Sequence, residues 1–294
     1  MLHRIRITLE MIKWEHSIFA LPFALTGAAL AAHGFPPAAH AGWLAAKLGW
    51  IVLCMISARS AAMAFNRWAD ADLDAANPRT RLRAIPAGLL ARNFAAGFTL
   101  VMSALFLFGA WRLNQLTLIL SPVVLVILFL YSYTKRFTRW SHLFLGLALG
   151  IAPTGAWIAI RGALDARILV LTLAVLFWVA GFDVLYACQD EQHDRTAGLY
   201  SIPATLGLAS AFWIARGMHL LMLALLIELA VLFHLGPIAA AGIVAVAALL
   251  LWEHTLVSPR DLTRLNAAFF TMNGVIAVIF FLFVAADLLI RRHA

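Results

Sequence analysis

The chain has 294 residues, of which 64% are hydrophobic and only 12% are charged, and its net charge is +8. An ordinary soluble domain carries about 25% charged residues, so the composition argues against that class. Apolar runs of about 20 residues recur along the whole chain, as in transmembrane helices, whereas a membrane β-barrel would show short alternating segments. The sequence therefore predicts an all-α polytopic membrane protein with a single domain over residues 1–294.

Nine apolar segments are candidates for membrane-spanning helices. The first follows "MLHRIRITLEMIKWE", and no small-residue cleavage pattern stands out in "LTGAALAAHGFPP", so we expect a retained helix and not a signal peptide. The predicted spans are 16–33, 42–66, 89–110, 115–133, 141–160, 166–189, 208–233, 237–256 and 267–289. An odd number of spans places the two chain termini on opposite sides of the membrane.

The basic residues are divided unequally between the two sides of these spans. Fourteen lysines and arginines fall on the side of the N-terminus and six on the other, while Arg59 and Arg216 lie within spans. Because loops rich in Lys and Arg stay in the cytoplasm, we expect a cytoplasmic N-terminus in the cell inner (cytoplasmic) membrane. This distribution accounts for the positive net charge without a nucleic-acid partner. We therefore expect the protein to lie in the lipid bilayer and not to bind nucleic acid.

Two charged stretches follow the second and the sixth span. The first acidic stretch, residues 66–88, reads "NRWADADLDAANPRTRLRAIPAG", and the second, residues 183–207, reads "DVLYACQDEQHDRTAGLYSIPATLG". Each contains two aspartates four residues apart, then Arg-Thr, then Ile-Pro-Ala. Since both follow an even-numbered span, both are expected on the cytoplasmic side. This degenerate internal repeat predicts a central, cytoplasm-facing cavity with an acidic wall from each half of the chain.

On helices, the polar residues of each stretch would form a stripe along one side. The stripes are Asn66, Asp70 and Asp74 in the first stretch, and Asp183, Tyr186, Asp190 and Asp194 in the second. Stacked carboxylates repel one another unless a cation lies between them, and oxygen ligands suit Mg²⁺, which takes one or two carboxylates plus substrate phosphates. Arg79 and Arg83 lie four residues apart directly downstream and suit a phosphate anion.

Other readings of these stretches fit less well. The sequence "DADLD" has the first acidic positions of an EF-hand loop, but Ala75 replaces the required glycine and Arg81 replaces the bidentate glutamate. No P-loop or GxGxxG motif is present, the histidines do not cluster at zinc spacing, and Cys54 and Cys188 fall within or at the end of apolar runs. The alternative of two solvated loops that cap membrane helices is weakened because the pattern occurs twice on one side.

The two motifs resemble those of a known family. The patterns N-x₃-D-x₃-D from Asn66 and D-x₂-Y-x₃-D-x₃-D from Asp183, with the basic segment "YSYTKRFT" between them, are similar to the UbiA family of intramembrane prenyltransferases. Some members carry an aspartate directly after the asparagine, where this chain has Arg67. "KWEHSIFALPFAL" and "NAAFFTMNG" look most like the bacterial branch that uses 4-hydroxybenzoate, or dihydroxynaphthoate in the futalosine route to menaquinone.

The resemblance implies a magnesium-dependent enzyme of ubiquinone or menaquinone biosynthesis. Two Mg²⁺ ions would bridge the diphosphate of a polyprenyl donor to Asn66, Asp70, Asp74, Asp190 and Asp194. The allylic C–O bond would ionise and the ring of an aromatic carboxylic acid would attack the carbocation, while apolar helices would exclude water. Catalytic roles are implied for Asp70, Asp74, Asp183, Asp190, Asp194 and Tyr186.

Several of these roles remain open. Asp183 would orient a metal ligand or take the ring proton, and Tyr186 would face the diphosphate or the carbocation or belong to the interfacial aromatic belt. Lys135 and Arg136 would bind diphosphate or supply ordinary positive-inside charge. The sequence does not define the prenyl chain length or separate the two acceptor acids.

Arg59 lies within the second span, seven residues before Asn66 and therefore on the same helix face. A charged residue at the centre of a membrane helix costs about 2.5–3.5 kcal/mol on insertion scales and usually has a function. The resemblance places an arginine here that faces the carboxylate of the acceptor. The alternative is an arginine paired with an acidic neighbour near the interface.

Two alternatives to this function remain at the level of sequence. One is a related prenyltransferase for another acceptor, of the haem, chlorophyllide or lipid type. The other is a transporter, which usually carries polar residues near the midplane of several helices. Here the acidic residues gather at one end of the second and sixth spans, and four other spans are nearly free of charge. That pattern favours an enzyme.

Overall fold

A computed structural model describes residues 2–13, 17–34, 37–265 and 272–293 of the chain. Over these residues the structure consists of helices and their connections, with one isolated β-bridge between Ser258 and Asp261. The predicted all-α class is therefore confirmed. The helices, in chain order, are α1 (Leu2–Ile12), α2 (Ser17–Ala32), α3 (Pro37–Ala69), α4 (Ala71–Ala76), α5 (Arg92–Leu113), α6 (Gln115–Thr134), α7 (Ser141–Arg161), α8 (Ile168–Ala187), the 3₁₀ turn η2 (Cys188–Asp190), α9 (Glu191–Thr196), α10 (Ile202–Leu206), α11 (Leu208–Leu232), α12 (Pro237–Leu256) and α14 (Asn273–His293).

Eight of the described helices are long and apolar enough to cross a membrane. They correspond to the second to ninth predicted spans, although the predicted start of the ninth, at residue 267, lies outside the described residues. The first predicted span coincides with α2, whose apolar segment Ala20–Ala32 is shorter than the others. The chain is thus a multi-pass membrane protein, while a count of nine full-length spans is not confirmed.

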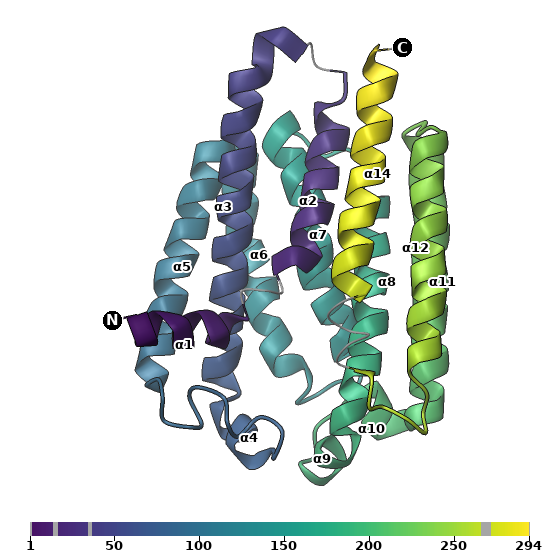
Figure 1. The fold of residues 1–294 in the computed structure, drawn as a ribbon. Coiled ribbons are helices and arrows are strands. Elements are labelled where there is room, and N and C mark those ends of the chain that lie inside the picture. Colours follow the sequence, from purple (N-terminus) through teal and green to yellow (C-terminus); the bar gives the residue numbers. More distant parts are fainter. Residues whose placement is uncertain (1, 14–16, 35–36, 266–271, 294) are drawn as a thin grey trace.

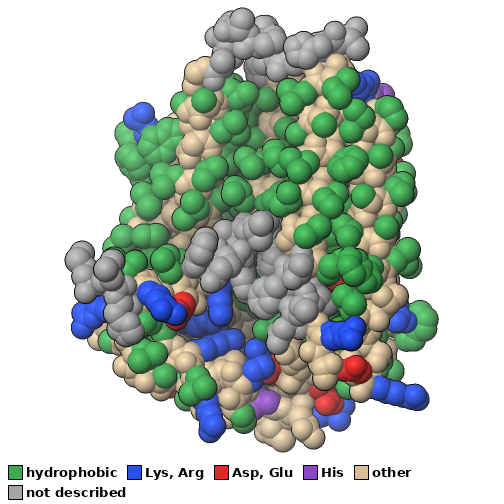
Figure 2. Space-filling view, viewed as in Figure 1, with side chains coloured by type: hydrophobic (Ala, Val, Ile, Leu, Met, Phe, Trp, Pro, Cys, Tyr) green, Lys and Arg blue, Asp and Glu red, His purple; other side chains and the backbone are tan. Residues whose placement is uncertain are grey.

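The long helices pack side by side, and the two chain termini lie toward opposite ends of the bundle (Figure 1). Helix α1 lies across one side of this bundle near its lower end in Figure 1, and the short helices α4, α9 and α10 gather at that same end. Figure 2 shows charged side chains concentrated there, below a broad apolar surface over the long helices. The polar end of the molecule therefore coincides with the end that carries the short helices.

Glycines let α7 and α8 approach closely. A Cβ at Gly146 would lie 2.3 Å from the backbone oxygen of Leu176, and one at Gly150 would lie 2.7 Å from that of Thr172. Small residues four apart are a common means of close helix packing in membranes, because lipid provides no hydrophobic drive between helices. Helix α8 accordingly runs through the core, with Trp178 fully buried.

Both acidic stretches bend at the first of their two aspartates that lie four residues apart. Helix α3 ends just before Asp70, whose φ and ψ are −97° and 8°, and α4 starts after it. At the matching place in the second stretch, Asp190 has φ and ψ of −103° and 6° and precedes α9. The polar residues of each stretch therefore lie on two consecutive helical segments that meet at an aspartate, and not on one straight helix. The matching backbone supports the internal repeat that the sequence predicts.

Candidate functional site

A cavity of about 700 Å³ opens at the polar end of the bundle, between the two acidic stretches. All twelve residues singled out from the sequence line this cavity: Arg59, Asn66, Asp70, Asp74, Arg79, Arg83, Lys135, Arg136, Asp183, Tyr186, Asp190 and Asp194. They come from α3, α4, the loop before α5, the end of α6, α8 and α9. Residues more than 100 positions apart in the chain are thus brought together.

Asp70 lies at the bend between α3 and α4. Asn66 donates from Nδ2 to Asp70 Oδ2 over 2.8 Å, and Arg136 donates from Nη2 to Asp70 Oδ1 over 3.2 Å. Burial raises the pKa of the Asp70 carboxyl above its ordinary value, and the Arg136 hydrogen bond and the nearby Lys135 oppose that shift only in part. This site therefore favours additional positive charge.

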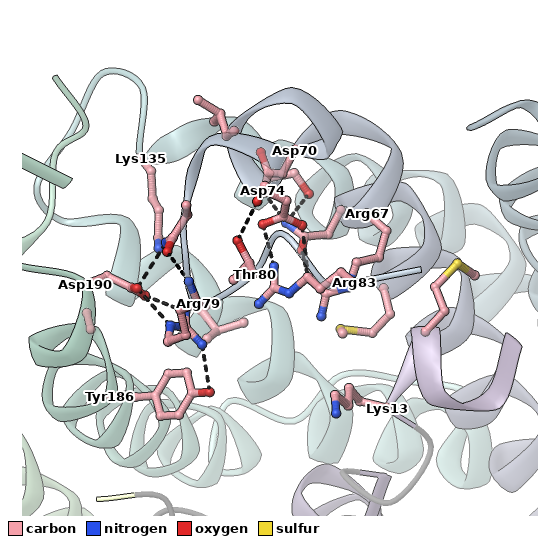
Figure 3. Close-up of a pocket in the computed structure, with 18 of the residues that line it drawn as sticks. Lys13, Arg67, Asp70, Asp74, Arg79, Thr80, Arg83, Lys135, Tyr186 and Asp190 are labelled. Atoms are coloured by element: carbon pink, nitrogen blue, oxygen red, sulfur yellow. Dashed lines mark hydrogen bonds and ion pairs between the residues drawn. The ribbon is translucent and has the colours of Figure 1, made fainter. Parts of the chain in front are cut away.

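Asp74 lies one turn further along, on α4, and is largely buried. Arg83 donates to its Oδ1 over 2.6 Å, while Arg67 approaches its Oδ2 at 3.9 Å. The Thr80 hydroxyl donates to the backbone oxygen of Asp74 over 3.0 Å, which folds the loop after α4 back over the helix. Figure 3 shows both arginines next to Asp74.

Arg67 directly follows the predicted second span, 42–66, whereas the structure continues that helix to Ala69. Arg67 lies in the last turn of α3, is only 8% exposed and lines the cavity. A signal was present in the sequence, because Arg67 precedes Asp70 by three residues and Asp74 by seven, the spacing of one helix face.

Asp190 joins the two acidic stretches. Arg79, from the first stretch, donates to both carboxylate oxygens of Asp190, with 2.8 Å from Nε to Oδ1. The same guanidinium donates to the Tyr186 hydroxyl over 3.3 Å, and Asn77 donates to Asp190 Oδ1 over 3.1 Å. The loop before α5 therefore reaches across the cavity to the opposite acidic wall (Figure 3). Asn77 was missed because its partner is 113 residues away.

The remaining two carboxylates of the second stretch have different surroundings. Asp194 is 2% exposed, and its Oδ2 has no hydrogen-bond partner among the described residues. Asp183 lies deeper along α8, and its Oδ2 is 2.7 Å from Nδ1 of His142 on α7. His142 also went unnoticed in the sequence, since nothing local connects it to a residue 41 positions later.

The deeper part of the cavity combines one cation with apolar side chains. Arg59 lines it from α3, two turns before Asn66. Met63 from the same helix, Leu145 and Leu149 from α7, and Phe182 from α8 complete this region. The cavity is therefore lined by charged side chains at the polar end of the bundle and largely by apolar side chains further into it.

The residues present suit divalent ions that a phosphate-bearing ligand helps to coordinate. Among the described residues, no three His, Cys, Asp or Glu side chains lie close enough to form a complete metal site. However, Oδ2 of Asp74 and Oδ2 of Asp194 are buried without a hydrogen bond in the described structure. Mg²⁺ characteristically binds one or two carboxylates together with substrate phosphates, so this oxygen-only donor set fits it.

Comparisons with known proteins agree with this arrangement. The sequence pattern of the UbiA prenyltransferase family matches residues 20–284. The chain is 33% identical over 257 residues to a 4-hydroxybenzoate octaprenyltransferase of Aromatoleum aromaticum, covering 85% of this chain and 83% of that protein. It is 32% identical over 253 residues to the enzyme of the same name from Cupriavidus metallidurans, covering 83% of this chain and 85% of that one.

Solved structures extend the comparison to the fold. A UbiA homologue from Aeropyrum pernix has a TM-score of 0.82 and 32% identity, with coverage of 94% of this chain and 98% of that one. A UbiA homologue from Archaeoglobus fulgidus, determined with GPP and Mg²⁺ bound, has a TM-score of 0.74 at 18% identity, with coverage of 96% and 99%. The transporter alternative is thereby set aside: the chain belongs to the UbiA prenyltransferase family and is a membrane-embedded transferase.

Proposed function

We propose that this protein transfers a polyprenyl group from a polyprenyl diphosphate to the ring of an aromatic carboxylic acid, either 4-hydroxybenzoate or a dihydroxynaphthoate, in ubiquinone or menaquinone biosynthesis. The observation that carries the proposal is a single cavity in which carboxylates and arginines face each other at one end and an arginine lies among apolar side chains at the other. The relatives named for 4-hydroxybenzoate support the same acceptor class.

The polar end suits the diphosphate of the donor. We expect Mg²⁺ to be held by the oxygen ligands of the two stretches, which are Asn66, Asp70, Asp74, Asp190 and Asp194. The Archaeoglobus homologue, whose structure contains both GPP and Mg²⁺, supports this expectation. When bound there, Mg²⁺ neutralises charge on the leaving diphosphate. The remaining phosphate oxygens would be contacted by the basic residues of the cavity, which are Arg79, Arg83, Lys135 and Arg136. The three arginines now pair with carboxylates, and on binding the diphosphate they would leave those carboxylates for the phosphate oxygens.

The deeper end suits the acceptor. Arg59 would form a bidentate pair with the acceptor's carboxylate, which is a strong interaction away from water. The ring would then point back toward the diphosphate, where the allylic C–O bond breaks and a ring carbon bonds to the allylic carbon. Apolar side chains such as Phe182 and Leu149 would shield the allylic cation from water.

The orientation in the membrane follows from charge. The cavity opens at the end where basic side chains gather, and the basic residues of the sequence predominate on the side of the N-terminus. By the positive-inside rule, this side would face the cytoplasm, and the cavity mouth would open on the cytoplasmic side of the inner membrane. Residues 1–294 would act as one domain, because both acidic stretches contribute to one cavity.

The experiment is an acceptor panel with one fixed donor. Purified protein in lipid nanodiscs receives a polyprenyl diphosphate, Mg²⁺ and, in turn, 4-hydroxybenzoate, 1,4-dihydroxy-2-naphthoate or a phenol without a carboxylate, and diphosphate release is measured. We expect turnover with at least one acid and little with the neutral phenol. The same panel with Arg59→Ala should show a steep rise in the KM of the acid and an unchanged KM of the donor. Equal use of neutral phenols by the wild-type protein would contradict the proposal.

A further inference from the structure

His142 holds one of the cavity carboxylates from outside the two acidic stretches. It lies in the first turn of α7 and is fully buried, whereas the Asp183 side chain is 15% exposed and lines the cavity. The 2.7 Å contact from His142 Nδ1 to Asp183 Oδ2 therefore leaves Asp183 Oδ1 as the oxygen available to a ligand.

The second ring nitrogen of His142 determines which atom carries the proton. The backbone N–H of Ile202, at the start of α10, donates to His142 Nε2 over 3.3 Å. A nitrogen that accepts a hydrogen bond carries no proton, and a neutral imidazole has only one N–H. His142 is thus the Nδ1–H tautomer, and it donates to Asp183. Asp183 is consequently an acceptor at Oδ2.

This arrangement differs from that of the carboxylates nearer the cavity mouth. Asp70, Asp74 and Asp190 each pair with an arginine. A neutral histidine instead orients Asp183 without cancelling its charge.

Asp183 lies in the same cavity as the arginine that is expected to bind the acceptor. Asp183 and the neighbouring Phe182 line the cavity from α8, and Arg59 lines it from α3. An acid held by Arg59 would therefore present its ring to a cavity wall that includes Asp183.

We propose that His142 is a positioning residue that orients Asp183 as the proton acceptor of the ring substitution. The inference rests on the proposed function. In the step considered, the allylic C–O bond to diphosphate breaks and a ring carbon forms a C–C bond with the allylic carbon. The ring C–H bond then breaks, its electron pair restores the aromatic ring, and the proton passes to Asp183 Oδ1. Asp183 touches the reacting atoms, and His142 acts through it.

The test compares two substitutions of His142 with ring-deuterated acceptor. His142→Leu removes the donor, whereas His142→Asn keeps an N–H close to the position of Nδ1. We expect His142→Leu to lower kcat about 10- to 100-fold, the scale of partners that orient a ligating or reacting group, with the donor KM unchanged. Proton loss should become rate-limiting, so a primary deuterium isotope effect on kcat should appear in His142→Leu. In His142→Asn, kcat should largely recover and the isotope effect should be small.

A matched control separates orientation from simple loss of packing. His219 on α11 is also buried and donates from Nε2 to the backbone oxygen of Trp178 over 3.3 Å, and it is not among the residues that line the cavity. His219→Leu should lower the melting temperature comparably but produce no isotope effect. The inference is overturned if His142→Leu shows no isotope effect, if His219→Leu shows the same one, or if His142→Asn is as impaired as His142→Leu. Absence of turnover in the wild-type protein would instead refute the proposed function.

Discussion

Arg79→Ala should weaken use of the prenyl diphosphate while sparing the acceptor. In the structure, Arg79 reaches from the first acidic stretch to Asp190 and Tyr186, and its side chain is 32% exposed while that of Asp190 is 7% exposed. A hydrogen bond to a charged group contributes about 1.5–3 kcal/mol, which corresponds to roughly 10- to 150-fold in an equilibrium constant. Because Arg79 is partly open to solvent, we expect the lower part of that range, about 10- to 30-fold in kcat/KM for the donor.

The assay is steady-state diphosphate release in nanodiscs, with the donor varied at saturating acceptor and then the reverse. Arg81→Ala is the matched control, since Arg81 lies in the same loop but is exposed and does not line the cavity. Its donor kinetics should remain at the wild-type level. The reasoning would be refuted by equal losses in the two variants, by an unchanged donor kcat/KM in Arg79→Ala, or by a rise confined to the KM of the acceptor.

Three further predictions concern the carboxylates, the metal and helix packing. Asp70→Asn and Asp190→Asn should each lower turnover by about 100-fold or more. Asp72→Asn should leave turnover unchanged, because the Asp72 side chain is 86% exposed. An Asp72→Asn variant as impaired as Asp70→Asn would contradict the proposed site. EDTA should abolish diphosphate release and added Mg²⁺ should restore it; undiminished release in EDTA would rule out the metal. Gly146→Ala should lower the melting temperature, because its Cβ would lie 2.3 Å from a backbone oxygen of α8, whereas Gly155→Ala, with nothing within 4 Å, should melt like the wild type.

The sequence predicts the membrane helices well because the length and composition of each apolar run are local properties. The predicted span 115–133 corresponds to α6 (Gln115–Thr134), and 141–160 corresponds to α7 (Ser141–Arg161). The bends at Asp70 and Asp190 were not predicted, because side-chain spacing alone does not report a break in the backbone.

The site could be predicted where its chemistry repeats along the chain and not where it depends on packing. The paired aspartates and the Arg-Thr and Ile-Pro-Ala elements recur in both stretches, so their common location could be anticipated. Asn77 and His142 have partners far away in sequence, and only the close packing of the helices brings them together. Arg67 has helical spacing to Asp70 and Asp74 and could have been recognised by it.

The central claim is that one cavity joins a polyprenyl diphosphate to an aromatic acid, and the most direct measurement is the stoichiometry of a single turnover. Protein in nanodiscs, in excess over the donor, is mixed with Mg²⁺ and 4-hydroxybenzoate or 1,4-dihydroxy-2-naphthoate, and diphosphate and lipid products are measured by mass spectrometry. The account predicts one diphosphate released per prenylated acid formed with at least one of the acids, and no product when Mg²⁺ or the acid is omitted. Diphosphate release accompanied only by a prenyl alcohol, or no release with either acid, would contradict it.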